Sequence, residues 1–92
     1  MRRVRWRARA LADLETIKAW LAKQSNANPT KTLLRIKTAA DTLRRLGDIG
    51  RPSRVEGVRE MSVRAAPYVI AYQVAGDTID ILAVYHTAQD RR

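Results

Sequence analysis

The chain has no cysteine, and it has one histidine, His86, among its 92 residues. Without thiolates it can form neither disulfides nor zinc–thiolate sites, and one imidazole is too few for a histidine-based metal site. We therefore expect neither a metal nor another cofactor. Phenylalanine is also absent, so the core must be built from aliphatic side chains with a few Trp and Tyr. A core this thin would gain from a partner that adds buried surface.

Long apolar runs are missing as well. No stretch of the sequence approaches the roughly 20 apolar residues needed to cross a bilayer. The basic residues 1–7 are not followed by the apolar stretch of a signal peptide. We expect a cytoplasmic protein that has no membrane among its partners. The length suits one compact domain, so we expect a single domain over residues 1–92.

Positive charge dominates the composition. The formal net charge is +9, and only four of the 18 basic residues are lysines. Arginine keeps its charge at physiological pH and binds phosphate or carboxylate through two parallel hydrogen bonds. The composition therefore predicts a polyanion, a nucleoprotein or an acidic protein as the partner. The alternative is a solvated surface in an arginine-biased composition.

The first half of the chain has the periodicity of a strand and two helices. Residues 3–7 alternate apolar and basic side chains, which predicts a short strand with one buried face. Two helical stripes follow, separated by Asn28 as a cap and Pro29 at the first helical position, and Gly47 is a plausible stop. A short connection predicts that the helices pack as an antiparallel hairpin. The stripes are Leu11, Leu14, Ile17 and Leu21 in the first helix, and Leu33, Ile36, Ala40, Leu43 and Leu46 in the second.

The second half has the periodicity of strands. A polar loop over residues 48–57 precedes a strand over 58–63, and two further strands over 67–74 and 78–85 flank a turn at Gly76. The last two strands are apolar on both faces over much of their length, so they should be central. The sequence predicts an α+β fold of order β-α-α-β-β-β, with an antiparallel sheet and the N-terminal helical hairpin packed on one face.

This order of elements, with its short motifs, resembles the ParE/RelE superfamily of bacterial toxins. The resemblance implies a growth-inhibiting toxin of a plasmid-stabilising type II toxin–antitoxin module. It also implies a cognate antitoxin that folds along apolar grooves of the toxin, as a hetero-oligomer, and for this contact we expect Leu14, Ile17, Leu21 and Tyr72. The motifs that carry the resemblance are Ala10-x-x-Asp13-Leu14-x-x-Ile17, Asn28-Pro29, Gly50-Arg51, Val58-Arg59-Glu60-Met61-x-Val63, Pro67-Tyr68-Val69-Ile70-Ala71-Tyr72 and Ile81-Leu82-Ala83-Val84-Tyr85-His86-Thr87-Ala88-Gln89.

Two targets compete within that resemblance. The run from Val84 to Asp90 is similar to the ending of the ParE branch, whose members inhibit DNA gyrase by binding, and this is the function we favour. The alternative is a RelE-like endoribonuclease that cuts messenger RNA on the ribosome, and a third class is a toxin-like fold that has lost its activity and only binds an antitoxin. For a ribonuclease we expect Arg59, His86 and Tyr85 as catalytic residues. For contact with nucleic acid or target we expect Arg51, Arg54, Arg59, Gln89, Arg91 and Arg92.

The ribonuclease hypothesis has a weakness in its proton-transfer groups. No lysine follows Lys37, whereas the resemblance implies lysines around the loop and second strand of the lysine-dependent nucleases. Arginine does not readily give up its proton. Acid–base work would therefore fall to Tyr85, His86, Glu56 and Glu60.

Each candidate residue also has a structural interpretation. His86 shares strand parity with Val84 and could cap the buried face by hydrogen-bonding a loop carbonyl. Arg59 falls on the more apolar side of its strand and could be held there by Asp13 or Glu15. The remaining aromatics could stack bases, but core packing is the stronger expectation in a chain with so few of them. They are Trp6, Trp20, Tyr68 and Tyr72.

Overall fold

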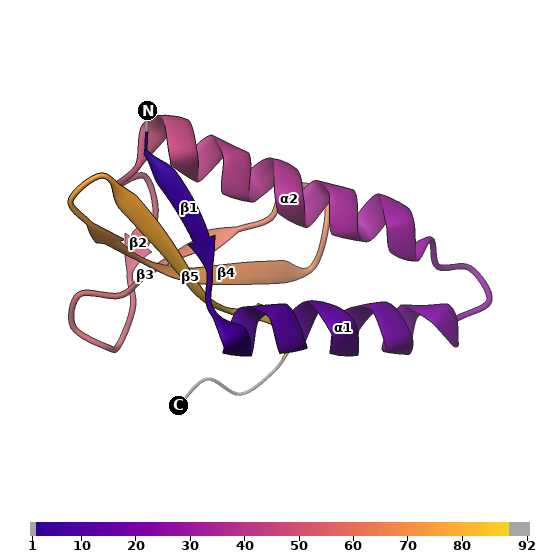
Figure 1. Ribbon diagram of the computed structural model, residues 1–92. Coiled ribbons are helices and arrows are strands. Elements are labelled where there is room, and N and C mark those ends of the chain that lie inside the picture. Colours follow the sequence, from indigo (N-terminus) through magenta and orange to yellow (C-terminus); the bar gives the residue numbers. More distant parts are fainter. Residues whose placement is uncertain (1, 89–92) are drawn as a thin grey trace.

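The computed structural model describes residues 2–88 and has the predicted α+β architecture, with two helices stacked on one face of a sheet (Figure 1). The expected order of elements is confirmed, with one addition: a two-residue strand lies inside the segment expected to be a loop. The elements are β1 Arg3–Trp6, α1 Ala8–Ala22, α2 Pro29–Leu46, β2 Arg51–Pro52, β3 Arg59–Ser62, β4 Tyr68–Ala75 and β5 Thr78–His86.

The sheet is mixed rather than fully antiparallel. Its strand order is β1-β5-β4-β3-β2, and β1 runs parallel to β5, with Val4 opposite Ile79. The other three pairings are antiparallel, which was expected for β3 with β4 and for β4 with β5. β1 and β2 form the two edges of the sheet, and the helical hairpin connects them. β3, β4 and β5 then fill the sheet in order from β2, so that β5 lies next to β1. Strand periodicity shows which face a side chain occupies but not the direction of the neighbouring strand, which is why the parallel pair was not predicted.

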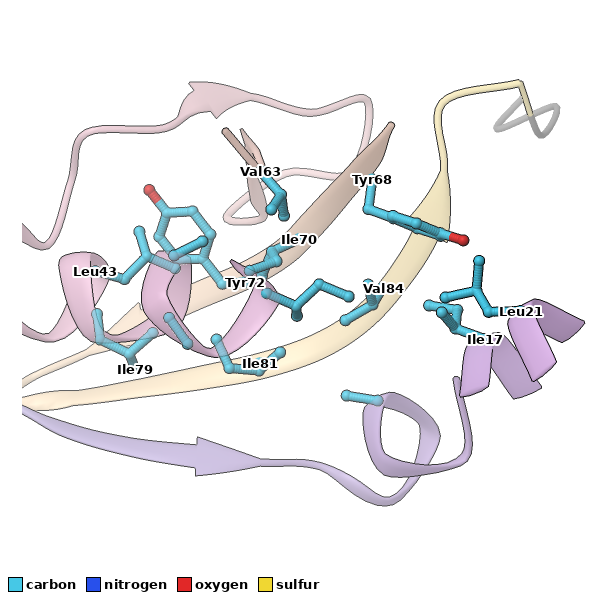
Figure 2. Close-up of a cluster of buried hydrophobic side chains, with 14 residues drawn as sticks. Ile17, Leu21, Leu43, Val63, Tyr68, Ile70, Tyr72, Ile79, Ile81 and Val84 are labelled. Carbon is cyan, nitrogen blue, oxygen red and sulfur yellow. The ribbon is translucent and has the colours of Figure 1, made fainter. Parts of the chain in front are cut away.

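The core lies between the sheet and the helices. Helix α1 packs mainly on β5, and α2 packs across β1, β4 and β5. Figure 2 shows Tyr72, Leu43 and Ile79 together at one end of this layer, and Tyr68 with Ile17 and Leu21 at the other. We call the opposite face of the sheet, which neither helix covers, the open face. The expected stripes are largely confirmed as core, but their ends are not, because Leu11 is 51% exposed and Leu46 is 53% exposed.

Residues at its two ends set the limits of α2. The Asn28 side chain accepts a hydrogen bond from the Lys31 backbone N–H at 3.0 Å, and Pro29 is the first residue of α2. Gly47 ends α2 at φ 68°, a left-handed conformation that glycine adopts without strain. Neither helix in the described part of the chain is long and apolar enough to span a bilayer.

Candidate functional site

Three strands bring a cation, a carboxylate and a phenol together on the open face. Arg51 on β2 stands opposite Glu60 on β3, and its guanidinium lies 3.4 Å from the Glu60 carboxylate. The Tyr85 hydroxyl on β5 donates a hydrogen bond to the other carboxylate oxygen of Glu60. Ala71 on β4 stands opposite Glu60, and Ala83 on β5 stands opposite Ala71. Their small side chains let the phenol reach across the sheet.

Glu60 and Tyr85 line an open groove of about 610 Å³. Arg54, on the loop after β2, and Arg9, near the start of α1, line the groove together with Glu60 and Tyr85. Both arginines are exposed, so the groove can hold phosphate or carboxylate groups through bidentate hydrogen bonds. Its carboxylate and phenol are the groups within reach of such a ligand that could move a proton.

Arg59 lies on the other face of the sheet. It stands opposite Tyr72, its guanidinium donates to the Gly50 carbonyl at 2.7 Å, and its Nε lies 3.7 Å from the Asp48 carboxylate. The structure therefore corrects the expectation that Asp13 or Glu15 holds this arginine. Arg59 holds the loop after α2 against the sheet and does not face the groove that Arg54 lines with Glu60 and Tyr85.

Asp13 has a different role from the one expected. Its carboxylate accepts a hydrogen bond from the Val84 backbone N–H at 2.9 Å and one from Arg9 at 3.3 Å. The Val84 contact ties α1 to β5 next to the bulge in the β4–β5 register. This carboxylate satisfies a backbone N–H of β5 that lies beyond the end of the pairing with β1, which stops at Trp6 opposite Ile81.

His86 points toward the helices, at the far end of the sheet from Arg59. Its Nδ1 accepts a hydrogen bond from the Ala88 backbone N–H at 3.0 Å, and its ring meets Tyr68 edge to face with centroids 5.4 Å apart. The expected capping role is thus supported, with a backbone donor in place of a loop carbonyl. Neighbouring residues of a strand point to opposite faces, so Tyr85 lies on the open face while His86 does not.

The three residues expected to form a ribonuclease site are therefore not brought together. His86 stands opposite Tyr68 and Arg59 opposite Tyr72, four residues along β4, which corresponds to roughly 13 Å of strand. Tyr85 is separated from both by the sheet. The described residues also contain no group of three or more His, Asp or Glu side chains that could hold a metal ion.

The residues expected to bind an antitoxin are mostly core residues. Tyr72 is completely buried, Ile17 and Leu21 are each 8% exposed, and Leu14 is half-buried against the core. This corrects the expectation for Tyr72, because its side chain has no surface to offer. Burial raises the pKa of Tyr72 and also that of Tyr68, the other tyrosine of β4. Base stacking by these two rings is excluded for the same reason.

The sequence did not predict every residue of the groove, and three of the predicted contact residues lie outside the part of the chain that the structure describes. Gln89, Arg91 and Arg92, expected to contact the target, lie outside the described residues. Arg9 was not predicted as a groove residue. Its place beside the groove depends on where α1 begins, which the sequence does not fix. Glu60 was considered only for acid–base work, although its parity in β3 already placed it on the face opposite Arg59.

A second ion pair lies on the open face, between the parallel strands. Arg5 stands opposite Asp80, and its Nε lies 2.6 Å from the Asp80 carboxylate. That hydrogen bond, reinforced by the charge of the guanidinium, holds the pKa of Asp80 below its usual range and raises the pKa of Arg5. The pair joins β1 to β5 on the open face.

Known toxins and a solved toxin–antitoxin system are similar to this chain over most of its length. The chain is 38% identical to the toxin RelE2 of Caulobacter vibrioides over 89 residues, which is 97% of this chain and 99% of that protein. It is 36% identical over 88 residues to the protein Y4kP of Sinorhizobium fredii, covering 96% and 91% of the two chains. Among solved structures, the chromosomal ParDE system of P. aeruginosa has a chain of 27% identity that superposes with a TM-score of 0.71, covering 94% of this chain and 96% of that one.

The decisive comparison is with a protein family. Residues 4–91 match the family described as the ParE toxin of the type II toxin–antitoxin system parDE. The match includes both helices and all five strands except Arg3 at the start of β1, and therefore every residue that lines the open-face groove. The chain belongs to the ParE toxin family of type II toxin–antitoxin systems.

Proposed function

We propose that this chain inhibits growth by binding and poisoning DNA gyrase, without catalysing a reaction itself, and that a cognate antitoxin neutralises it in a toxin–antitoxin hetero-oligomer. The observation that carries this proposal is the separation of Arg59 from His86 along the helix-covered face of the sheet. A general acid or base must lie within hydrogen-bond reach of the reacting group. Arg59 on β3 and His86 on β5 are offset by roughly 13 Å in the strand direction, and each side chain bonds to a different part of the backbone, so they do not converge on one phosphodiester.

Both of these residues have structural partners that account for them. Arg59 holds the loop through Gly50 and Asp48, and His86 accepts from the backbone next to the Tyr68 ring. A binding function needs no acid–base set. It needs exposed charge and shape, and the exposed arginines of the open face supply charge that matches a nucleoprotein such as gyrase bound to DNA.

The second candidate function is a RelE-like endoribonuclease acting on messenger RNA. The observation that favours it is the contact of Glu60 with Tyr85 at the bottom of the arginine-lined groove. In that reaction Glu60 would take the proton of the ribose 2′-hydroxyl, and Tyr85 would give a proton to the leaving oxygen. Arg51 and Arg54 would stabilise the charge on the phosphate. The site residues of this alternative therefore differ from the set expected from sequence.

The order in which synthesis fails in cells separates the two functions. After induction of the chain without antitoxin, incorporation of labelled thymidine and of labelled methionine is followed over the first minutes. Gyrase poisoning predicts that DNA synthesis falls first and protein synthesis later. An early fall of protein synthesis would instead support the ribonuclease, and uninterrupted growth would indicate a fold that only binds its antitoxin.

A further inference from the structure

The edge strand β1 carries a row of arginines on the open face. Val4 and Trp6 pack against the core. Because side chains alternate along a strand, Arg3 and Arg5 point to the opposite face, which neither helix covers. Arg7 follows β1 directly, keeps an extended backbone, and donates its backbone N–H to β5 at 2.9 Å. The row therefore continues to Arg7 and ends where α1 begins.

Strand geometry sets the spacing of these side chains. Alternate residues of a strand are about 6.6 Å apart, so the row from Arg3 to Arg7 is about 13 Å long. That length corresponds to the rise of about four nucleotides along one strand of B-form DNA. Each arginine can bind a phosphate through two parallel hydrogen bonds. A straight row of three is therefore complementary to one polynucleotide backbone.

The positive charge of this row is available to a ligand. Among residues 2–88, no carboxylate lies within ion-pair distance of Arg3 or Arg7. Arg5 is paired with Asp80, yet its side chain is 60% exposed and has further N–H donors. The pKa of Asp80 is lowered mainly by the bond from Arg5 and further by the charge of Arg7, which agrees with a position of Arg7 on the same face.

The row has no aromatic side chain for base stacking. Trp6 packs against the core, and Tyr68 and Tyr72 are buried. Tyr85 lies in the open-face groove and not in the row. Proteins that bind single strands combine a basic track with aromatics on which the bases stack. A row of cations alone contacts phosphates and carries no sequence information, which favours a duplex over a single strand.

We propose that Arg3, Arg5 and Arg7 bind the phosphate backbone of duplex DNA without reading its sequence. Arg9, two residues further along the chain, lines the open-face groove, so the row ends beside that groove. The inference deepens the proposed function and rests on it for the choice of DNA as the polyanion. It gives the chain a contact with the DNA that gyrase holds, in addition to a contact with the enzyme.

The test measures binding of the purified chain to a short fluorescent DNA duplex by anisotropy at several salt concentrations. Each phosphate contact contributes about 0.9 to the slope of log affinity against log salt, so Arg3→Gln with Arg7→Gln should weaken binding and reduce that slope by about 1.8. The matched control is Arg44→Gln with Arg45→Gln, which removes the same charge from exposed positions in the last turn of α2. Equal slopes for the two double variants would overturn the inference.

A single-stranded RNA of the same length tests the choice of nucleic acid. Duplex DNA should bind more tightly than this RNA at every salt concentration. Tighter binding of the RNA would contradict the proposal. Melting temperatures verify that both double variants remain folded.

Supercoiling assays separate this inference from the proposed function. Arg3→Gln with Arg7→Gln should inhibit gyrase only at a higher concentration than the wild type, whereas the α2 control should act like the wild type. If the wild-type chain leaves gyrase untouched, the gyrase proposal fails, yet the salt slopes still decide the DNA contact. If the wild type inhibits gyrase but the row does not affect duplex binding, the DNA contact is refuted and the gyrase proposal stands.

Discussion

The hydroxyl of Tyr72, a fully buried residue at one end of the core, accepts a hydrogen bond from the backbone N–H of Gly50 at 2.7 Å. The same hydroxyl lies 3.3 Å from the Gly47 carbonyl, to which it donates. One buried phenol thereby anchors both ends of the turn between α2 and β2. Arg59 adds its bond to the Gly50 carbonyl, so the loop that leads to Arg51 on β2 is fixed from two sides.

Replacing Tyr72 by Phe should loosen that turn. The variant leaves the half-buried Gly50 N–H without its partner. An unsatisfied buried donor costs about 1–3 kcal/mol of unfolding free energy, and we expect a loss at the lower end of that range. Urea unfolding measures the loss. In hydrogen exchange the Gly50 amide should lose protection, while the Gly47 amide, bonded to the Leu43 carbonyl at 2.7 Å, serves as the internal control. A variant as stable as the wild type would refute the anchoring role.

A methyl group at Gly50 should be more damaging than one at Gly76. A Cβ at Gly50 would lie 2.5 Å from the Tyr72 hydroxyl and 2.6 Å from the Glu60 carbonyl oxygen, so the backbone must move. A Cβ at Gly76 meets no atom within 4 Å and is opposed only by the left-handed φ of 62°. We expect Gly50→Ala to lower the melting temperature further than Gly76→Ala, and the reverse order would show that the turn is not tightly packed.

The Arg5–Asp80 pair should give the fold an acid dependence. Because the bond from Arg5 lowers the pKa of Asp80 in the folded chain, the unfolded state binds the proton more readily. The stabilisation is complete above the usual carboxyl pKa, about 4, and is lost as pH falls below it toward the folded pKa. Asp80→Asn should therefore lose less stability than the wild type between about pH 5 and pH 3.

The comparison is made with urea midpoints at each pH. Asp77→Asn, in the exposed turn before β5, is the control and should retain the wild-type acid dependence. If Asp80→Asn follows the wild-type curve as well, the ion pair does not stabilise the junction of β1 with β5.

The contact of Glu60 with Tyr85 distinguishes binding from catalysis. If the chain acts by binding gyrase, Glu60→Gln and Tyr85→Phe should leave inhibition of supercoiling unchanged, because neither variant alters the shape of the groove. A ribonuclease that used these groups would lose about 10²–10⁴-fold in cleavage rate from each change. Gln73→Ala, an exposed position of β4 on the open face, is the control in both assays.

Much of the fold was predictable because its signals are local. Asn28, Pro29 and Gly47 mark the limits of α2 through capping and backbone conformation, and the apolar stripes identify the buried faces. The direction of β1 was not predictable, since it depends on pairing with a strand 75 residues away, as the Arg5–Asp80 bond shows.

The candidate site was predicted less well, because it depends on register. The sequence predicted that Arg59, Tyr85 and His86 lie in strands. Because Tyr85 and His86 are neighbours in one strand, their side chains must point to opposite faces of the sheet. The distance between Arg59 and His86, by contrast, depends on which residues of β4 the strands β3 and β5 pair with, and the sequence does not show this register. Tyr72 looked available for contact because of its strand position, whereas its hydroxyl is engaged by a loop that periodicity does not locate.

The most direct test of the proposed function is gyrase supercoiling of relaxed plasmid with the purified chain, run beside a coupled translation reaction. We predict that supercoiling is lost, or that cleaved DNA complexes accumulate, while translation continues. Blocked translation with cut messenger RNA, together with normal supercoiling, would contradict the gyrase proposal and identify the Glu60–Tyr85 groove as the site of a ribonuclease.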